Sequence, residues 1–129
     1  MNGRYLLDTN IVIAIFADET AVRQQLAGAG EVFVPSIALG ELYYGAHKSA
    51  RVASNIARVD EFAANNTVLV CDTETSRLYG NIKSELRAKG RPIPENDIWI
   101  AAVTTQHQLT LVTRDGHFNN VDGLLIDVW

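Results

Sequence analysis

The amino-acid sequence predicts a single α/β domain with a central parallel β-sheet flanked by helices. Short apolar runs rich in β-branched residues recur along the chain, and a helix-like segment follows most of them. Strands that alternate with helices usually lie parallel, in a sheet that is covered on both faces. A chain of 129 residues, 47% of them hydrophobic, can bury a real core, and we expect one domain over residues 1–129.

Five apolar runs are expected to form the strands, namely residues 5–7, 32–34, 68–70, 109–112 and 124–128. Helix starts are expected where polar residues follow the first three runs, at Thr9 or Asn10, at Ser36 after Pro35, and at Asp72 or Thr73. Ligands of such sheets bind outside the carboxyl ends of the strands. Polar residues that directly follow a strand are therefore candidates for a ligand site.

Two segments have a distinctive helix pattern, and the first of them departs from the simple alternation of strands and helices. Residues 36–65 are predicted to form two consecutive helices with no strand between them. The helix predicted from Thr73 to Lys89 has one apolar stripe formed by Leu78, Ile82 and Leu86. Gly90 ends this helix.

The composition also indicates the compartment. The longest apolar run, residues 11–17, is too short to cross a bilayer, and residues 1–15 lack the features of a secretory signal. We therefore expect a cytoplasmic protein with no membrane association. Cys71, the single cysteine, lies at the end of an apolar run and is expected to pack as a small core residue.

Asp8 lies in the stretch "YLLDTNIVIAIF", between two apolar runs. An ionised carboxylate in such a place needs a hydrogen-bond donor, a cationic partner or a metal ion to replace its lost hydration. Asp115 occupies a similar position, because it follows the apolar run 109–112 after only two residues. Two acids at the carboxyl ends of parallel strands can meet in one crevice although they are far apart in sequence.

Two more acids occupy unusual positions. Glu41 interrupts a largely apolar helix, and Asp97 stands at a helix start in "ENDIWIAAV". Each acid has an ordinary structural interpretation: Asp8 as a helix cap, Asp97 as an N-terminal helix acid, Asp115 as a turn residue and Glu41 on a solvated face. The set of four, each at the junction of an apolar run with a turn or helix, favours one shared site.

Clustered carboxylates repel one another unless they share protons or a cation neutralises them. A set of oxygen ligands without clustered His or Cys favours hard ions, so we expect Mg²⁺ or Mn²⁺. The hydroxyl of Thr113 could add a ligand, directly or through water. His117 lies close enough to Asp115 to be a candidate for substrate contact, and we leave it out of the metal ligands.

The charge is distributed unevenly. The net charge is −4, but between residues 77 and 91 five basic residues stand against the single acid Glu85: Arg77, Lys83, Arg87, Lys89 and Arg91. A solvated helix face explains this pattern as well as a contact surface does. An acidic metal pocket beside basic residues would suit a polyanion whose phosphodiester is hydrolysed at the metal, such as RNA.

Four motifs resemble one family. "LLDTNIVI", "PSIALGELYYGA", "GRPIPENDIWIAA" and "LVTRDGHF" resemble, in order and spacing, the PIN-domain ribonucleases, specifically the VapC-type toxins of bacterial toxin-antitoxin pairs. The resemblance implies a Mg²⁺- or Mn²⁺-dependent endoribonuclease acting on tRNA or ribosomal RNA. It also implies a homodimer and a VapB-like antitoxin that covers the acidic pocket and tethers the toxin to operator DNA.

The resemblance also assigns residues to roles. Asp8, Glu41, Asp97 and Asp115 match the catalytic and metal-binding acids of the family; Thr9 and Asn10 match the turn around the first acid, and Thr113 matches a hydroxyl near the metal. Many members have Asn at the position of Asp115 and an acid slightly later, where this chain has Asn119. Trp129 is expected to pack against the core.

Three other classes fit less well. A haloacid dehalogenase-like phosphatase needs a second Asp two residues after the first, where this chain has Asn10. A response-regulator receiver could use Asp72 as its phosphate acceptor, but it needs a Lys after the fifth strand, and none follows. A PIN-like binding module without catalysis is disfavoured because all four acids are present.

Overall fold

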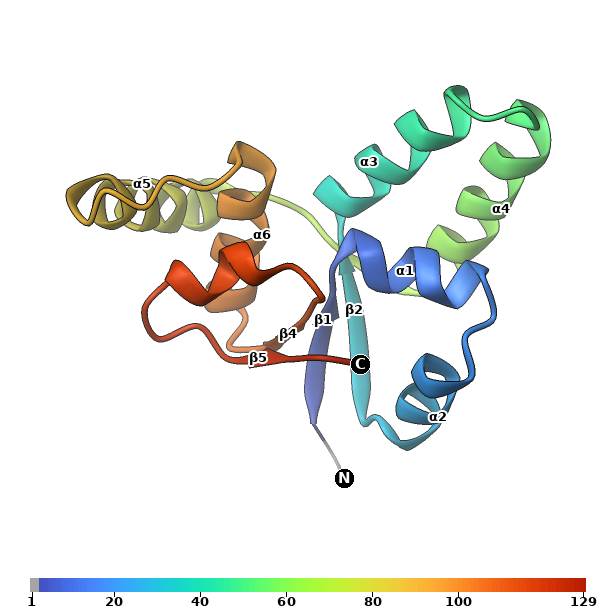
Figure 1. Ribbon diagram of the computed structural model, residues 1–129, viewed down its shortest axis with the longest axis horizontal. Coiled ribbons are helices and arrows are strands. Elements are labelled where there is room, and N and C mark those ends of the chain that lie inside the picture. The colour runs from blue at the N-terminus through green and yellow to red at the C-terminus, as the bar shows by residue number, and fades with distance from the viewer. Residues whose placement is uncertain (1–2) are drawn as a thin grey trace.

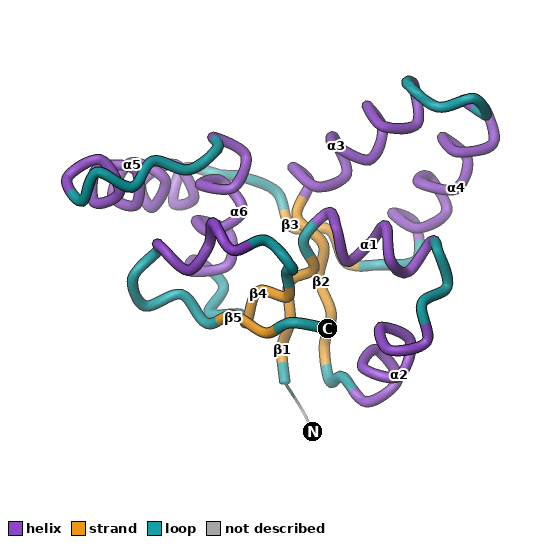
Figure 2. Tube along the Cα trace, in the orientation of Figure 1, coloured by secondary structure: helices purple, strands orange, loops and turns teal. Residues whose placement is uncertain are grey.

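The structure is a computed structural model that describes residues 3–129, and its centre is a sheet of five parallel strands. The strands lie in the order β3-β2-β1-β4-β5, which puts β1 in the middle (Figures 1 and 2). Their bounds are β1 Arg4–Leu7, β2 Glu31–Pro35, β3 Thr67–Leu69, β4 Thr110–Val112 and β5 Ile126–Asp127. The predicted parallel α/β fold is confirmed, and each strand overlaps its predicted run.

Helices cover both faces of the sheet. Figure 1 shows α5 and α6 on one side and α1, α3 and α4 on the other. Their bounds are α1 Thr9–Phe16, α2 Thr20–Gly28, α3 Ser36–His47, α4 Val52–Ala64, α5 Thr73–Ala88 and α6 Glu95–Gln106, with a 3₁₀ turn, η1, at Gly116–Asn120. The two consecutive helices predicted over residues 36–65 are α3 and α4.

The core consists of two apolar layers, one on each face of the sheet. Successive strand residues point to opposite faces, so Leu6 packs with the α5 and α6 layer while Leu7 packs with the α1, α3 and α4 layer. In β4, Leu111 and Val112 divide in the same way. Trp129 packs as expected: it is buried, and its ring meets Tyr5 edge-to-face at 5.3 Å.

The helix ends follow the predicted signals. Asp72 caps α5 in a capping box with Thr75, and Gly90 just beyond this helix has a φ of +67° that suits glycine. Helix α2 is not among the predicted elements, because its apolar face is short: Val22 is its only buried residue, and Leu26 packs partly against the core. Cys71 packs against the core as expected, and burial raises the pKa of its thiol.

In the part of the chain that the structure describes, we find no helix with both the length and the apolar character needed to cross a membrane.

Candidate active site

The sheet order brings the predicted acids together. β1 and β4 are neighbours, and the backbone N–H of Asp8 donates to the carbonyl of Val112 at 3.0 Å, so the two strands end side by side. Asp8 follows β1, and Asp115 follows β4 after the turn at Thr113 and Arg114. Helix α6 begins at the same edge of the sheet and brings Asp97 in its first turn.

Asp8 is a helix cap and a member of the acid cluster at once. Its Oδ1 accepts the backbone N–H of Thr9 at 2.8 Å, and its Oδ2 accepts the hydroxyl of Thr113 at 2.7 Å. The residue is only 4% exposed. Burial raises its pKa, and the charges of Glu41 and Asp115 raise it further, against the lowering effect of the two donors.

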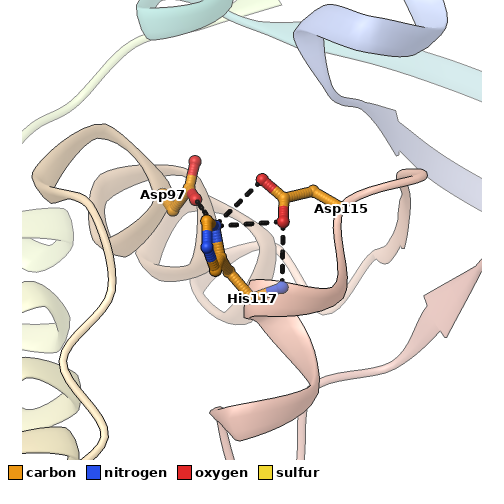
Figure 3. A group of neighbouring side chains, drawn as sticks. All are labelled: Asp97, Asp115 and His117. Carbon is orange, nitrogen blue, oxygen red and sulfur yellow. Dashed lines mark hydrogen bonds and ion pairs between the residues drawn. The ribbon is translucent and has the colours of Figure 1, made fainter.

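Asp97, Asp115 and His117 converge at the mouth of the site (Figure 3). Nδ1 of His117 lies 3.2 Å from Oδ2 of Asp97 and 3.1 Å from Oδ2 of Asp115. One ligand atom from each of the three residues lies within 4.8 Å of the others. The ring nitrogen therefore stands between two carboxylates.

The electrostatics of Asp97 reflect this crowding. The pKa of its carboxyl is raised from an ordinary 3.8 to about 6, mainly by burial and then by the charges of Asp115 and Asp8. The contact with His117 opposes this shift. Near neutral pH the site thus holds negative charge at a cost, which a bound cation would reduce.

Glu41 joins the cluster indirectly. It projects from α3, and its Oε1 accepts the hydroxyl of Thr9 at 2.7 Å. The same Thr9 donates its backbone N–H to Asp8, so one residue links both acids. Glu41 lies near enough to Asp8 for its charge to raise the pKa of that carboxyl.

The predicted supporting residues hold the two turns of the site. The carboxamide of Asn10 accepts the backbone N–H of Arg114 at 3.2 Å, which ties the turn after β1 to the turn after β4. The hydroxyl of Thr113 accepts the backbone N–H of Asp115 at 3.0 Å while it donates to Asp8. Asn119 is exposed on η1, and Asp115 is the acid that points toward Asp97.

His117 is the residue that sequence reasoning left out of this group. The side chain of Asp115 caps η1 by accepting the backbone N–H of His117, and this turn aims the imidazole back at the two carboxylates. The signal in the sequence was the two-residue spacing in "RDGHF". Such a spacing suits an Asx turn that folds a side chain over its neighbour.

The basic residues of segment 77–91 do not form one open surface. Three of them are in ion pairs: Arg77 with Glu74, Lys83 with Glu95 and Lys89 with Asp122. Within residues 3–129, Arg87 and Arg91 have no ion pair. The segment therefore carries less unpaired positive charge than its sequence alone suggests.

The donor chemistry of the cluster fits a hard divalent cation. Asp8, Asp97, Asp115 and Glu41 offer carboxylate oxygens, the ligands that suit Mg²⁺ and Mn²⁺. Asp97 and Asp115 are the two acids whose oxygens already point at one place.

This fold and this acidic site define a known class of protein. The PIN domain family matches residues 5–124. The chain therefore belongs to the PIN-domain family.

Within that family, its relatives are VapC ribonucleases. It is 38% identical over 129 residues to ribonuclease VapC2 of Haemophilus influenzae and 33% identical to the tRNA(fMet)-specific endonuclease VapC of Shigella flexneri, with 98% of each chain covered in both cases. A solved structure of DNA-bound VapBC from Salmonella typhimurium matches with a TM-score of 0.91 and 32% identity over 98% of both chains. VapBC2 from Rickettsia felis, bound to a promoter DNA fragment, matches with a TM-score of 0.88, 29% identity and coverage of 97% of this chain and 98% of that one.

Proposed function

We propose that this protein is a divalent-metal-dependent endoribonuclease, the toxin of a toxin-antitoxin pair. The observation that carries the proposal is the convergence of the Asp97 and Asp115 carboxylates beside buried Asp8, at the carboxyl edge of a PIN-domain sheet. The names of the VapC relatives support an RNA substrate. The proposed reaction is hydrolysis of a phosphodiester bond.

Asp97 and Asp115 would hold the ion, with Asp8 and Glu41 adding negative charge behind them. Bound Mg²⁺ or Mn²⁺ would supply a Lewis acid that lowers the pKa of a water molecule and offsets charge on the transition state. The residues of the chain prepare this site: Thr113 fixes the orientation of Asp8, and its hydroxyl holds the turn that presents Asp115.

The substrate class and partners follow from the same relationship and stay proposals. Two relatives carry the name tRNA(fMet)-specific endonuclease, which supports tRNA as the substrate to test first. The solved VapBC structures support a VapB-like antitoxin, with operator DNA reached through that partner. We also propose a homodimer, which the family resemblance implies, and a cytoplasmic location, which the sequence predicts.

The test is cleavage of pooled tRNA and ribosomal RNA by the purified, antitoxin-free protein. Cleavage is expected with Mg²⁺ or Mn²⁺, not in EDTA, and not with the Asp8→Asn variant. Asp18→Asn is the matched control, because Asp18 is an exposed acid in a surface ion pair with Arg23. Equal RNA cleavage in EDTA would exclude the proposed metal site, and full activity of Asp8→Asn would exclude a role for the charge of Asp8 in it.

A further inference from the structure

A hollow of about 360 Å³ lies directly beside the acid cluster, between the first turns of α3 and α6. Its lining is contributed by Ser36, Ile37, Gly40, Glu41, Tyr44 and Asn96. Glu41 is shared with the acid cluster, and Asn96 immediately precedes Asp97. The hollow is therefore within reach of a molecule held at the acids.

The outer wall of the hollow is an exposed aromatic ring. Tyr44 is 65% exposed, whereas Leu39 and Leu42 of the same helix are buried. It follows Glu41 by three residues, so it stands one helical turn above that acid on the same face of α3. An exposed aromatic side chain beside a phosphodiester site offers a surface on which a nucleobase can stack.

A cation stands next to this ring. The ammonium group of Lys48 lies 4.6 Å from the centre of the Tyr44 ring, at the end of α3 farther from the acids. Lys48 has no salt bridge within residues 3–129. Along α3 the Glu41 carboxylate thus comes first, followed by the open hollow, the Tyr44 ring and the Lys48 ammonium group. This order suits a single strand of RNA, because a base can stack on the ring and the next phosphate can meet the positive charge.

Gly40 lines the hollow and adds no side chain to it. Glycine inside a helix is destabilising relative to alanine, and a Cβ built at Gly40 would meet no atom within 4 Å. Helix packing therefore does not require glycine here.

We propose that the hollow between α3 and α6 binds the nucleobase next to the cleaved phosphodiester, with Tyr44 as the stacking residue and Lys48 as the contact for the adjoining phosphate. The occupant is single-stranded RNA. This inference rests on the proposed ribonuclease function. It adds to the proposed active site a subsite that selects for an unpaired base.

The test compares the binding of two fluorescently labelled strands, an adenosine dodecamer RNA and an abasic dodecamer with the same phosphates. Binding is measured in EDTA, which prevents cleavage. The protein is expected to bind the adenosine strand more tightly, and Tyr44→Ala should weaken that binding by about 5- to 100-fold while changing abasic binding little. Tyr44→Phe should retain the adenosine preference. Lys48→Ala should instead weaken both strands and reduce the salt dependence of binding.

Two matched controls separate the hollow from general effects. Leu125→Ala removes an equally exposed apolar side chain near the C-terminal end of α6, away from the acids, and should bind as the unmodified protein does. Gly40→Leu fills the hollow and should lose the adenosine preference, whereas Gly80→Leu, which also meets open space on α5, should keep it.

Equal binding of the two dodecamers by the unmodified protein would overturn the inference even if RNA is cleaved. Loss of a dimer in Tyr44→Ala, measured by light scattering, would assign this face to a second copy of the chain and also overturn it. The two proposals can also fail separately. If the protein cleaves no RNA but prefers the adenosine strand through Tyr44, the ribonuclease proposal is refuted and the base subsite is supported.

Discussion

Replacing Asp97 by asparagine should make the metal-free protein more stable at neutral pH, although it removes a proposed metal ligand. The side chain of Asp97 is 13% exposed, and its carboxyl pKa is raised from 3.8 to about 6 by burial and by the charges of Asp115 and Asp8. A raised folded-state pKa means that ionisation costs more in the folded protein than in the unfolded chain. Asparagine has nearly the same shape and no charge.

The magnitude follows from the pKa. Each pKa unit corresponds to about 1.4 kcal/mol, so a shift from 3.8 to about 6 makes ionised Asp97 cost the fold about 3 kcal/mol. The shift to about 6 is a net value that already includes the opposing effect of His117, so the loss of that contact in Asp97→Asn needs no separate correction. A gain in the free energy of unfolding of about 1–3 kcal/mol is therefore expected for Asp97→Asn above about pH 6.

The raised pKa of Asp97 also determines how the stabilising effect of Asp97→Asn depends on pH. The folded state binds more protons than the unfolded chain between about pH 4 and pH 6, so the contribution of Asp97 to stability is lost as the pH rises through that window. The stabilising effect of Asp97→Asn should consequently be near zero at about pH 4 and reach its full size above about pH 6.

Urea unfolding in EDTA, followed by circular dichroism at both pH values, measures this difference. Asp18→Asn is the control, because Asp18 is exposed and its surface ion pair with Arg23 should change stability by less than about 1 kcal/mol. Adding Mn²⁺ should stabilise the unmodified protein and leave Asp97→Asn unchanged, since only a protein that binds the ion gains stability from it. An Asp97→Asn variant that is no more stable than the unmodified protein at neutral pH in EDTA would refute this electrostatic argument.

Three further predictions concern the same site and its surroundings. Mn²⁺ affinity, measured by calorimetry, should fall by up to about tenfold per pH unit below about pH 6, because the proton of Asp97 competes with the ion; an affinity independent of pH would contradict this. Thr113→Val removes the donor to buried Asp8 and should cost about 1–3 kcal/mol in urea unfolding, whereas a neutral result would show that water replaces the hydroxyl. Replacing Arg87 and Arg91 by alanine should flatten the salt dependence of RNA binding by about one to two charges, and an unchanged slope would exclude this surface.

The strands and the four acids could be predicted because each has a local signal. Val68 and Leu111 belong to short β-branched or aliphatic runs, and Asp8 stands at the abrupt end of such a run. The order of the strands has no such signal. The pairing of β1 with β4 places Asp8 beside Asp115, and that pairing depends on the tertiary packing of both faces.

The charged surface shows what a sequence pattern leaves out. The run from Arg77 to Arg91 is basic in sequence, yet Lys83 contacts Glu95 and Lys89 contacts Asp122, which come from segments outside the run. The chain folds these acids onto α5, so the sequence count overstates the free positive charge. The spacing in "RDGHF" indicates the local contact of His117 with Asp115, but it does not indicate the contact with Asp97, which joins residues from two separate elements.

The two interpretations of Asp8, helix cap and metal-site acid, turn out to be compatible. Each carboxylate oxygen can accept more than one hydrogen bond or ligand. Oδ1 of Asp8 accepts from the backbone of Thr9, and Oδ2 accepts from the Thr113 hydroxyl at 2.7 Å and from the Asn10 carboxamide at 3.4 Å. The cap therefore orients the carboxylate without using all of its capacity. Asp8→Asn keeps an oxygen that can accept from Thr9 and loses the charge, so a loss of activity in that variant with an intact fold would report on the charge and not on the helix.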